Sequence, residues 1–105
     1  MLAVIYRSKI ISGKEELYIE CWREISAFLK NNKGALGSCI HQDVQSGLWV
    51  IYSRWPDLET KEKSWPLDGK EDLPEGILRI SDLMLSCVEE IYEPQFLELI
   101  EDALL

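Results

Sequence analysis

Two short segments of the chain, Leu2–Tyr6 and Leu48–Tyr52, are apolar at every position. Their β-branched and aromatic residues are typical of β-strands. A strand with one face in water normally alternates apolar and polar residues, and these two strands do not. Both faces of the sheet are therefore predicted to be covered. Helices of the same chain can cover one face, so the other face needs a further partner.

The length of the chain limits what that partner can be. It has 105 residues, which is enough for one domain with its own core and leaves no second domain. Hydrophobic residues make up 47% of the chain, the share that globular domains usually have. We therefore predict one domain over residues 1–105 that forms a homodimer, in which two copies pack their sheets face to face.

In the first half of the chain, the patterns predict a strand, a helix and a hairpin. Residues 2–11 are a predicted strand, and Ser12 with Glu15 fits a capping box that begins a helix. Residues 36–44 and 48–55 are predicted strands joined by a short turn that contains glycine. The helix between has one continuous apolar stripe, made of Leu17, Tyr18, Cys21, Trp22, Ile25, Phe28 and Leu29.

The second half predicts a helical region in two pieces. Asp57 is predicted to cap a short helix that ends at Trp65, and residues 67–70 are a predicted loop. Asp72 and Glu75 form a second capping-box pattern, with a proline in the first turn. Apolar residues then recur at helical spacing as far as Pro94, at Ile77, Ile80, Met84, Cys87, Val88 and Ile91.

The fold class follows from the order of these elements. Residues 95–105 fit either a strand or a short amphipathic helix, so the order is β-α-β-β-α with an optional last strand. This is the split βαβ arrangement of the ferredoxin-like fold. We predict an α+β protein, βαββαβ, whose antiparallel sheet carries its helices on one face.

The charge balance and the cysteines exclude several classes of function. With 19 acidic and 11 basic residues the formal net charge is −8, and no basic cluster is present, so neither nucleic acid nor an anionic membrane is an expected partner. The N-terminal residues lack a signal-peptide pattern, and no apolar run could span a membrane. Cys21, Cys39 and Cys87 include no C-x-x-C pair, so we expect reduced core thiols, no metal site and a cytoplasmic protein.

Four local patterns lie at the boundaries of the predicted elements. They are Ile11-Ser-Gly-Lys-Glu-Glu16 with Trp22 in the helix that follows, Gly34-Ala-Leu-Gly-Ser38, Ser53-Arg-Trp-Pro56 and Trp65-Pro66. In these patterns the sequence resembles the antibiotic biosynthesis monooxygenase family of dimeric α+β barrels. The resemblance covers residues 2–66 and is weaker from Leu73 to the end. It implies that residues from Gln95 onward form a fourth strand, which often pairs across the dimer.

The resemblance also implies a choice of activities. Members of the family oxidise aromatic polyketides or quinols without a cofactor, degrade haem, or have no established activity. The haem-degrading branch uses an asparagine on the first strand, and a tryptophan and a histidine in the second helical region. Here Tyr6 occupies the asparagine position and Trp65 matches the tryptophan, but residues 66–105 contain no histidine. Haem cleavage by that mechanism is therefore not expected.

Oxygenation without a cofactor requires a phenolic substrate to be held in an apolar pocket and deprotonated. The candidate catalytic residues are Trp65, His41 and Tyr52. Trp65 is at the family position, His41 would be the base, and Tyr52 would donate a hydrogen bond. Each also has a structural interpretation: Trp65 as a hydrophobic plug, His41 as a solvent-facing side chain, and Tyr52 as a core residue.

The candidate substrate-binding residues are Tyr6, Arg54 and Trp22. Arg54 lies two residues from Tyr52, so both side chains project to the same face of one strand. It could bind a substrate anion or instead pair with one of the acidic side chains, whereas Tyr6 and Trp22 also fit a core. The function that we expect is a cofactor-independent monooxygenase acting on a small aromatic or quinol compound. The alternatives are a non-catalytic dimer that binds a small ligand or regulates, and haem binding through His41 without cleavage.

Overall fold

The computed structural model describes residues 1–65 and 73–104. It contains eight elements in these ranges: β1 (Leu2–Ile10), α1 (Glu15–Asn32), β2 (Gly37–Gln42), β3 (Trp49–Trp55), α2 (Leu58–Ser64), α3 (Glu75–Ser86), β4 (Val88–Ile91) and β5 (Gln95–Glu98). The fold is α+β and ferredoxin-like, as the sequence predicted. The predicted loop at 67–70 and the capping role of Asp72 fall outside the described residues.

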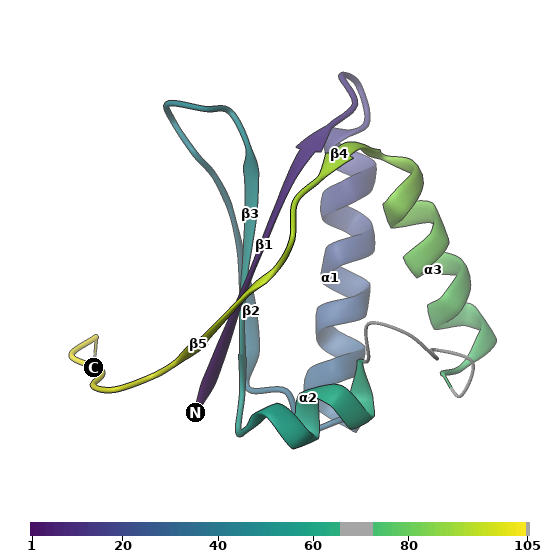
Figure 1. The fold of residues 1–105 in the computed structure, drawn as a ribbon. Coiled ribbons are helices and arrows are strands. Elements are labelled where there is room, and N and C mark those ends of the chain that lie inside the picture. Colours follow the sequence, from purple (N-terminus) through teal and green to yellow (C-terminus); the bar gives the residue numbers. More distant parts are fainter. Residues whose placement is uncertain (66–72, 105) are drawn as a thin grey trace.

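All strand pairs of the sheet are antiparallel, and β1 lies in its centre. The strands are ordered β2-β3-β1, and both β4 and β5 pair with the second edge of β1. β4 lies opposite Ser8–Ile10 and β5 lies opposite Leu2–Ile5, so the two together act as the last strand of the fold. Figure 1 shows α1 and α3 on one face of this sheet and the C-terminal segment on the other.

The pleat of the strands divides their side chains between the two faces. On β1, Val4 and Tyr6 belong to the core clusters beneath the helices, so the odd-numbered neighbours point to the outer face. On β3, Ile51 and Trp55 pack on the helical side in the same way. We call the two sides the helix face and the outer face.

The segment Val88–Ile91 is where the sequence prediction was wrong. Helical spacing predicted a helix as far as Pro94, but α3 ends at Ser86 and Val88 begins β4. Val88 pairs with Ile10 and Ile91 with Ser8, and a β-bulge between them skips one residue. A bulge puts residues three apart on the same face of a strand. Apolar residues at a spacing typical of a helix therefore lie on one face of a strand here. This strand forms because the edge of β1 needs hydrogen-bond partners.

The ends of the helices confirm one predicted cap and contradict another. The Asp57 side chain accepts a hydrogen bond from the backbone N–H of Thr60 at 2.7 Å, as predicted. The capping box of Ser12 and Glu15 does not form, since Lys14 is the N-cap and has no side-chain cap. Gly13 has φ +90°, which no helical residue adopts, and this delays the helix by two residues. The Glu15 carboxylate instead accepts from Gly13 N–H at 2.6 Å. Pro74 is predicted in the first turn of α3, but it is the N-cap residue, one position before the helix begins.

The outer face carries apolar side chains that no helix covers. Ile5, Val50 and Tyr52 are half-buried there, and Leu97 of β5 is 47% exposed. β5 begins at Gln95, as the resemblance implied, and pairs with β1 of its own chain. Cys21 and Cys87 are buried thiols as predicted, whereas Cys39 is exposed on β2 and is not a core residue. No helix in the described ranges is long and apolar enough to cross a membrane.

Candidate functional site

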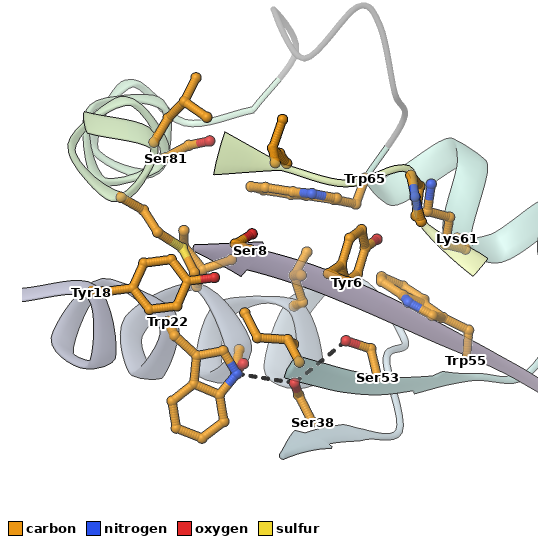
Figure 2. A pocket seen from close by; sticks show the side chains of 18 of the residues that line it. Tyr6, Ser8, Tyr18, Trp22, Ser38, Ser53, Trp55, Lys61, Trp65 and Ser81 are labelled. Carbon is orange, nitrogen blue, oxygen red and sulfur yellow. Dashed lines mark hydrogen bonds between the residues drawn. The ribbon is translucent and has the colours of Figure 1, made fainter. Parts of the chain in front are cut away.

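A cavity of about 340 Å³ lies between the helix face of the sheet and the helices. Its volume is within the range of small-ligand sites, roughly 300–1,000 Å³. Side chains from the sheet, from α1, from α3 and from the end of α2 line it, and most of them are apolar or aromatic (Figure 2). No residue of α3 is buried, and Ser81, Met84 and Leu85 of this helix line the cavity.

Three aromatic side chains gather toward the α2 end of the cavity. Trp55 is 2% exposed and belongs to the cluster that includes Leu2 and Val4, and Tyr6 and Trp65 pack against this cluster. Trp65 follows α2 directly, and its backbone N–H donates to the carbonyl of Lys61 at 2.7 Å. Trp65 is the C-cap residue of α2, where the backbone leaves helical geometry (φ −143°, ψ 72°), and it lines the cavity.

A short polar chain lies on the sheet side of the cavity. The indole Nε1 of Trp22 donates to the Ser38 hydroxyl at 3.0 Å, and the oxygens of Ser38 and Ser53 are 3.4 Å apart (Figure 2). This hydrogen bond links Trp22 of α1 to β2 and uses the only donor of the tryptophan side chain. The serine hydroxyls remain able to donate to or accept from a ligand.

The phenol of Tyr6 remains protonated at neutral pH. Burial, and secondarily the negative charge of Glu62, raise the pKa of Tyr6 to about 12. Burial also raises the pKa of Tyr18, which a hydrogen bond with Ser8 opposes. Neutral phenols donate hydrogen bonds, so Tyr6 can stabilise a ligand oxygen that gains negative charge, but it is not a base.

Lys61 is a cavity residue that the sequence prediction missed. Its side chain is fully buried, although lysine is rarely buried to this extent. Lys61 is four residues before Trp65, and side chains at that spacing lie on one helix face. This spacing could have suggested Lys61, but the sequence of α2 is rich in charges that a short surface helix usually exposes.

The structure brings only some of the predicted site residues together. Tyr6, Trp22 and Trp65 line the cavity. Tyr52 and Arg54 lie on the outer face, because Ile51 pairs with Tyr6 on the helix face and alternate residues of β3 point the other way. His41 lies on the outer face too, because it pairs with Val50. The sheet separates these three side chains from the cavity.

The outer-face residues form contacts of their own. Arg54 Nε donates to the Tyr52 hydroxyl at 2.6 Å, which confirms that both side chains share a face. Arg54 also pairs with Asp102 at 2.9 Å, the ion pair that was the alternative interpretation of this residue. His41 is exposed and is the only histidine of the chain, so the cavity has no imidazole to bind haem iron. In the described ranges, no three His, Cys, Asp or Glu side chains are grouped to hold a metal ion.

Comparison with solved structures identifies the fold. A proposed antibiotic biosynthesis monooxygenase from Caulobacter crescentus matches 95% of this chain and 90% of its own, with a TM-score of 0.75 and 12% identity. The chain has the antibiotic biosynthesis monooxygenase fold. A second protein of this description, from Nitrosomonas europaea, matches 96% of the chain and 100% of its own, with a TM-score of 0.73 and 16% identity.

SnoaB, a cofactor-independent oxygenase from Streptomyces nogalater, also has this fold. It matches 98% of the chain and 96% of its own, with a TM-score of 0.72 and 10% identity. No protein-family model and no curated protein sequence matches the chain. At identities this low, the likeness establishes the antibiotic biosynthesis monooxygenase fold and not the chemistry.

Proposed function

We propose that the protein is a cofactor-independent monooxygenase that acts on a small planar aromatic or quinol compound bound in the cavity. The observation that carries the proposal is the cavity of about 340 Å³, whose aromatic walls surround the neutral hydroxyl of Tyr6. The name of SnoaB, a cofactor-independent oxygenase of the same fold, supports it.

In the proposed reaction, the substrate carries a phenol conjugated to an oxidisable carbon. The bound phenol loses its proton to solvent, and the resulting anion transfers electrons to O₂. One oxygen atom becomes a carbonyl of the product and the other leaves as water, so a CH₂ group and O₂ give C=O and H₂O. The Tyr6 hydroxyl donates to the anionic oxygen, and Trp65 packs against the ring. These two residues position and stabilise the anion, and neither serves as a base.

We further propose that the protein is a homodimer whose outer faces pack together. The half-buried apolar residues Ile5 and Val50 on this face support the proposal. A second chain packed on this face would bury both side chains further.

A binding screen followed by an oxygen-uptake assay tests the proposed activity. Anthrone, quinol and flavonoid-like compounds are screened by tryptophan fluorescence, since Trp22, Trp55 and Trp65 line the cavity. We expect a binder that consumes one O₂ per product, and a Tyr6→Phe variant that binds it but oxidises it about tenfold more slowly, the loss that one hydrogen bond to an anion produces. Binding without oxygen consumption over the whole panel would overturn the proposed activity.

A non-catalytic ligand-binding protein is the second candidate. The observation that favours it is that none of the cavity-lining side chains among the described residues is a carboxylate or an imidazole. Such a cavity can bind a ligand without removing its proton. The oxygen-uptake assay separates the two candidates directly.

A further inference from the structure

The buried ammonium group of Lys61 is the least expected feature of the cavity. Within the described ranges it is the only cationic side chain that lines it. Removing an ammonium ion from water is costly unless a negative charge or several hydrogen bonds compensate it. Lys63, two residues further along the same helix, shows the usual arrangement: its side chain is 74% exposed and pairs with Glu59 at 2.8 Å.

The compensation that Lys61 receives from the described residues is weak. Its Nζ lies 3.4 Å from Glu62 Oε1, at the long limit of a hydrogen bond, and the Glu62 side chain is 43% exposed. Its other contact is with the ring of Phe96, whose centroid is 5.1 Å away. An ammonium group has three N–H donors, so this pairing leaves capacity for a stronger acceptor.

A ligand anion at this position would meet a complementary set of groups. The ammonium supplies charge, and the Tyr6 hydroxyl supplies a donor, while Trp55 and Trp65 provide aromatic walls on the same side of the cavity (Figure 2). Charge-assisted hydrogen bonds are about twice as strong as neutral ones, and they gain further strength away from water. Because Glu62 is partly exposed, its carboxylate can move into water when a ligand replaces it.

We infer that the cavity selects aromatic ligands bearing one negative charge, as a carboxylate or a phenolate, and that Lys61 Nζ is the counter-ion. The inference deepens the proposed function and rests on it in one respect, that this cavity is the ligand site. It requires no turnover, so it can be tested separately from the oxygenase activity. For an oxygenase substrate, the same ammonium would favour the ionised form that reacts with O₂.

The test compares two ligands that differ mainly in charge. Naphthalene-2-carboxylate and naphthalene-2-carboxamide share one ring system, and at neutral pH only the first is charged. We expect wild-type protein to bind the carboxylate at least about tenfold more tightly than the amide, the effect of one charge-assisted pair. Lys61→Met should reduce this ratio to about one and leave binding of the amide unchanged.

Three controls distinguish a binding role from a structural one. Lys63→Met removes a charge from the same helix and should leave the ligand ratio unchanged. Glu62→Gln removes the competing carboxylate and should tighten carboxylate binding several-fold. Lys61→Met should keep or raise the melting temperature, because an apolar chain of similar length replaces a poorly paired buried charge.

Each outcome separates the inference from the proposed function. Equal binding of carboxylate and amide, or a preference that persists in Lys61→Met, overturns the inference and leaves the oxygenase proposal standing. If naphthalene ligands and the quinol panel all fail to bind, both proposals are wrong. A strong carboxylate preference, with binding but no oxygen uptake over the whole quinol panel, supports the inference and overturns the oxygenase activity.

Discussion

The two faces of the sheet are built from alternating residues of the same strands, yet they differ in chemistry. The helix face is lined by aromatic rings and hydroxyl groups around one buried cation, Lys61. The outer face combines half-buried aliphatic side chains with the polar group of Tyr52, Arg54 and Asp102. The proposed ligand cavity and the proposed dimer surface are therefore formed by neighbouring residues of the same strands.

The largest effect is expected on the outer face. Ile5→Glu places a charge in the proposed dimer interface, where burying it costs roughly 3 kcal/mol or more. Light scattering should give the mass of two chains for wild-type protein and of one chain for the variant. Val44→Glu is the matched control, because Val44 is 98% exposed and should tolerate the same change. A monomeric wild-type protein, or a dimeric Ile5→Glu variant, contradicts the difference that we draw between the faces.

A smaller effect should be seen when Tyr6 ionises on the helix face. The unfolded chain releases this phenolic proton near the ordinary pKa of 10.0, whereas burial raises the folded pKa to about 12. The folded state is therefore disfavoured as the pH rises through this interval, by roughly 2 kcal/mol at its upper end. Denaturant titrations from pH 9 upward should show a smaller loss of stability for Tyr6→Phe than for wild-type protein. Parallel curves would mean that the phenol is not buried as described.

Trp65→Phe distinguishes a ligand wall from a hydrophobic plug. As a wall, the change should weaken binding of the naphthalene probes about tenfold, or ~1.4 kcal/mol, with little change in melting temperature. As a plug, stability should fall by roughly 1 kcal/mol and the affinity should remain. Trp49→Phe is the control, since Trp49 does not line the cavity. It packs edge-on against Tyr18, with 6.1 Å between the ring centroids.

The smallest effect is expected from Asp102→Asn on the outer face. Hydrogen bonds from Leu104 N–H and then from Arg54 lower the pKa of Asp102. The contribution of Asp102 to folding stability is therefore present above the ordinary carboxyl pKa, and it is lost as the pH falls through the lower pKa of the folded state. We expect a slight drop in melting temperature at neutral pH that high salt removes, because solvent and salt screen surface ion pairs. A large drop at high salt would mean that this contact holds the C-terminal segment in place.

Part of the candidate site could be predicted from the sequence. The apolar stripe of α1 and the resemblance indicated Trp22, Tyr6 and Trp65, which all line the cavity. His41, Tyr52 and Arg54 were chosen for their chemistry alone, and the register of β1 with β3 places Tyr52 and Arg54 on the other side of the sheet. Register depends on pairing between distant strands, so one sequence does not reveal which face a polar residue of a two-sided strand occupies.

The sequence by itself determined the elements whose signals are local. The apolar stripe of α1, the glycine turn of the hairpin and the Asp57 cap each depend on residues a few positions apart, and each formed as predicted. Tertiary structure decided the rest. Val88 became a strand because the edge of β1 required a partner, and Lys61 became buried because α2 packs beside Trp55 and β5. Contacts of long range override local preference wherever the local signal fits two structures.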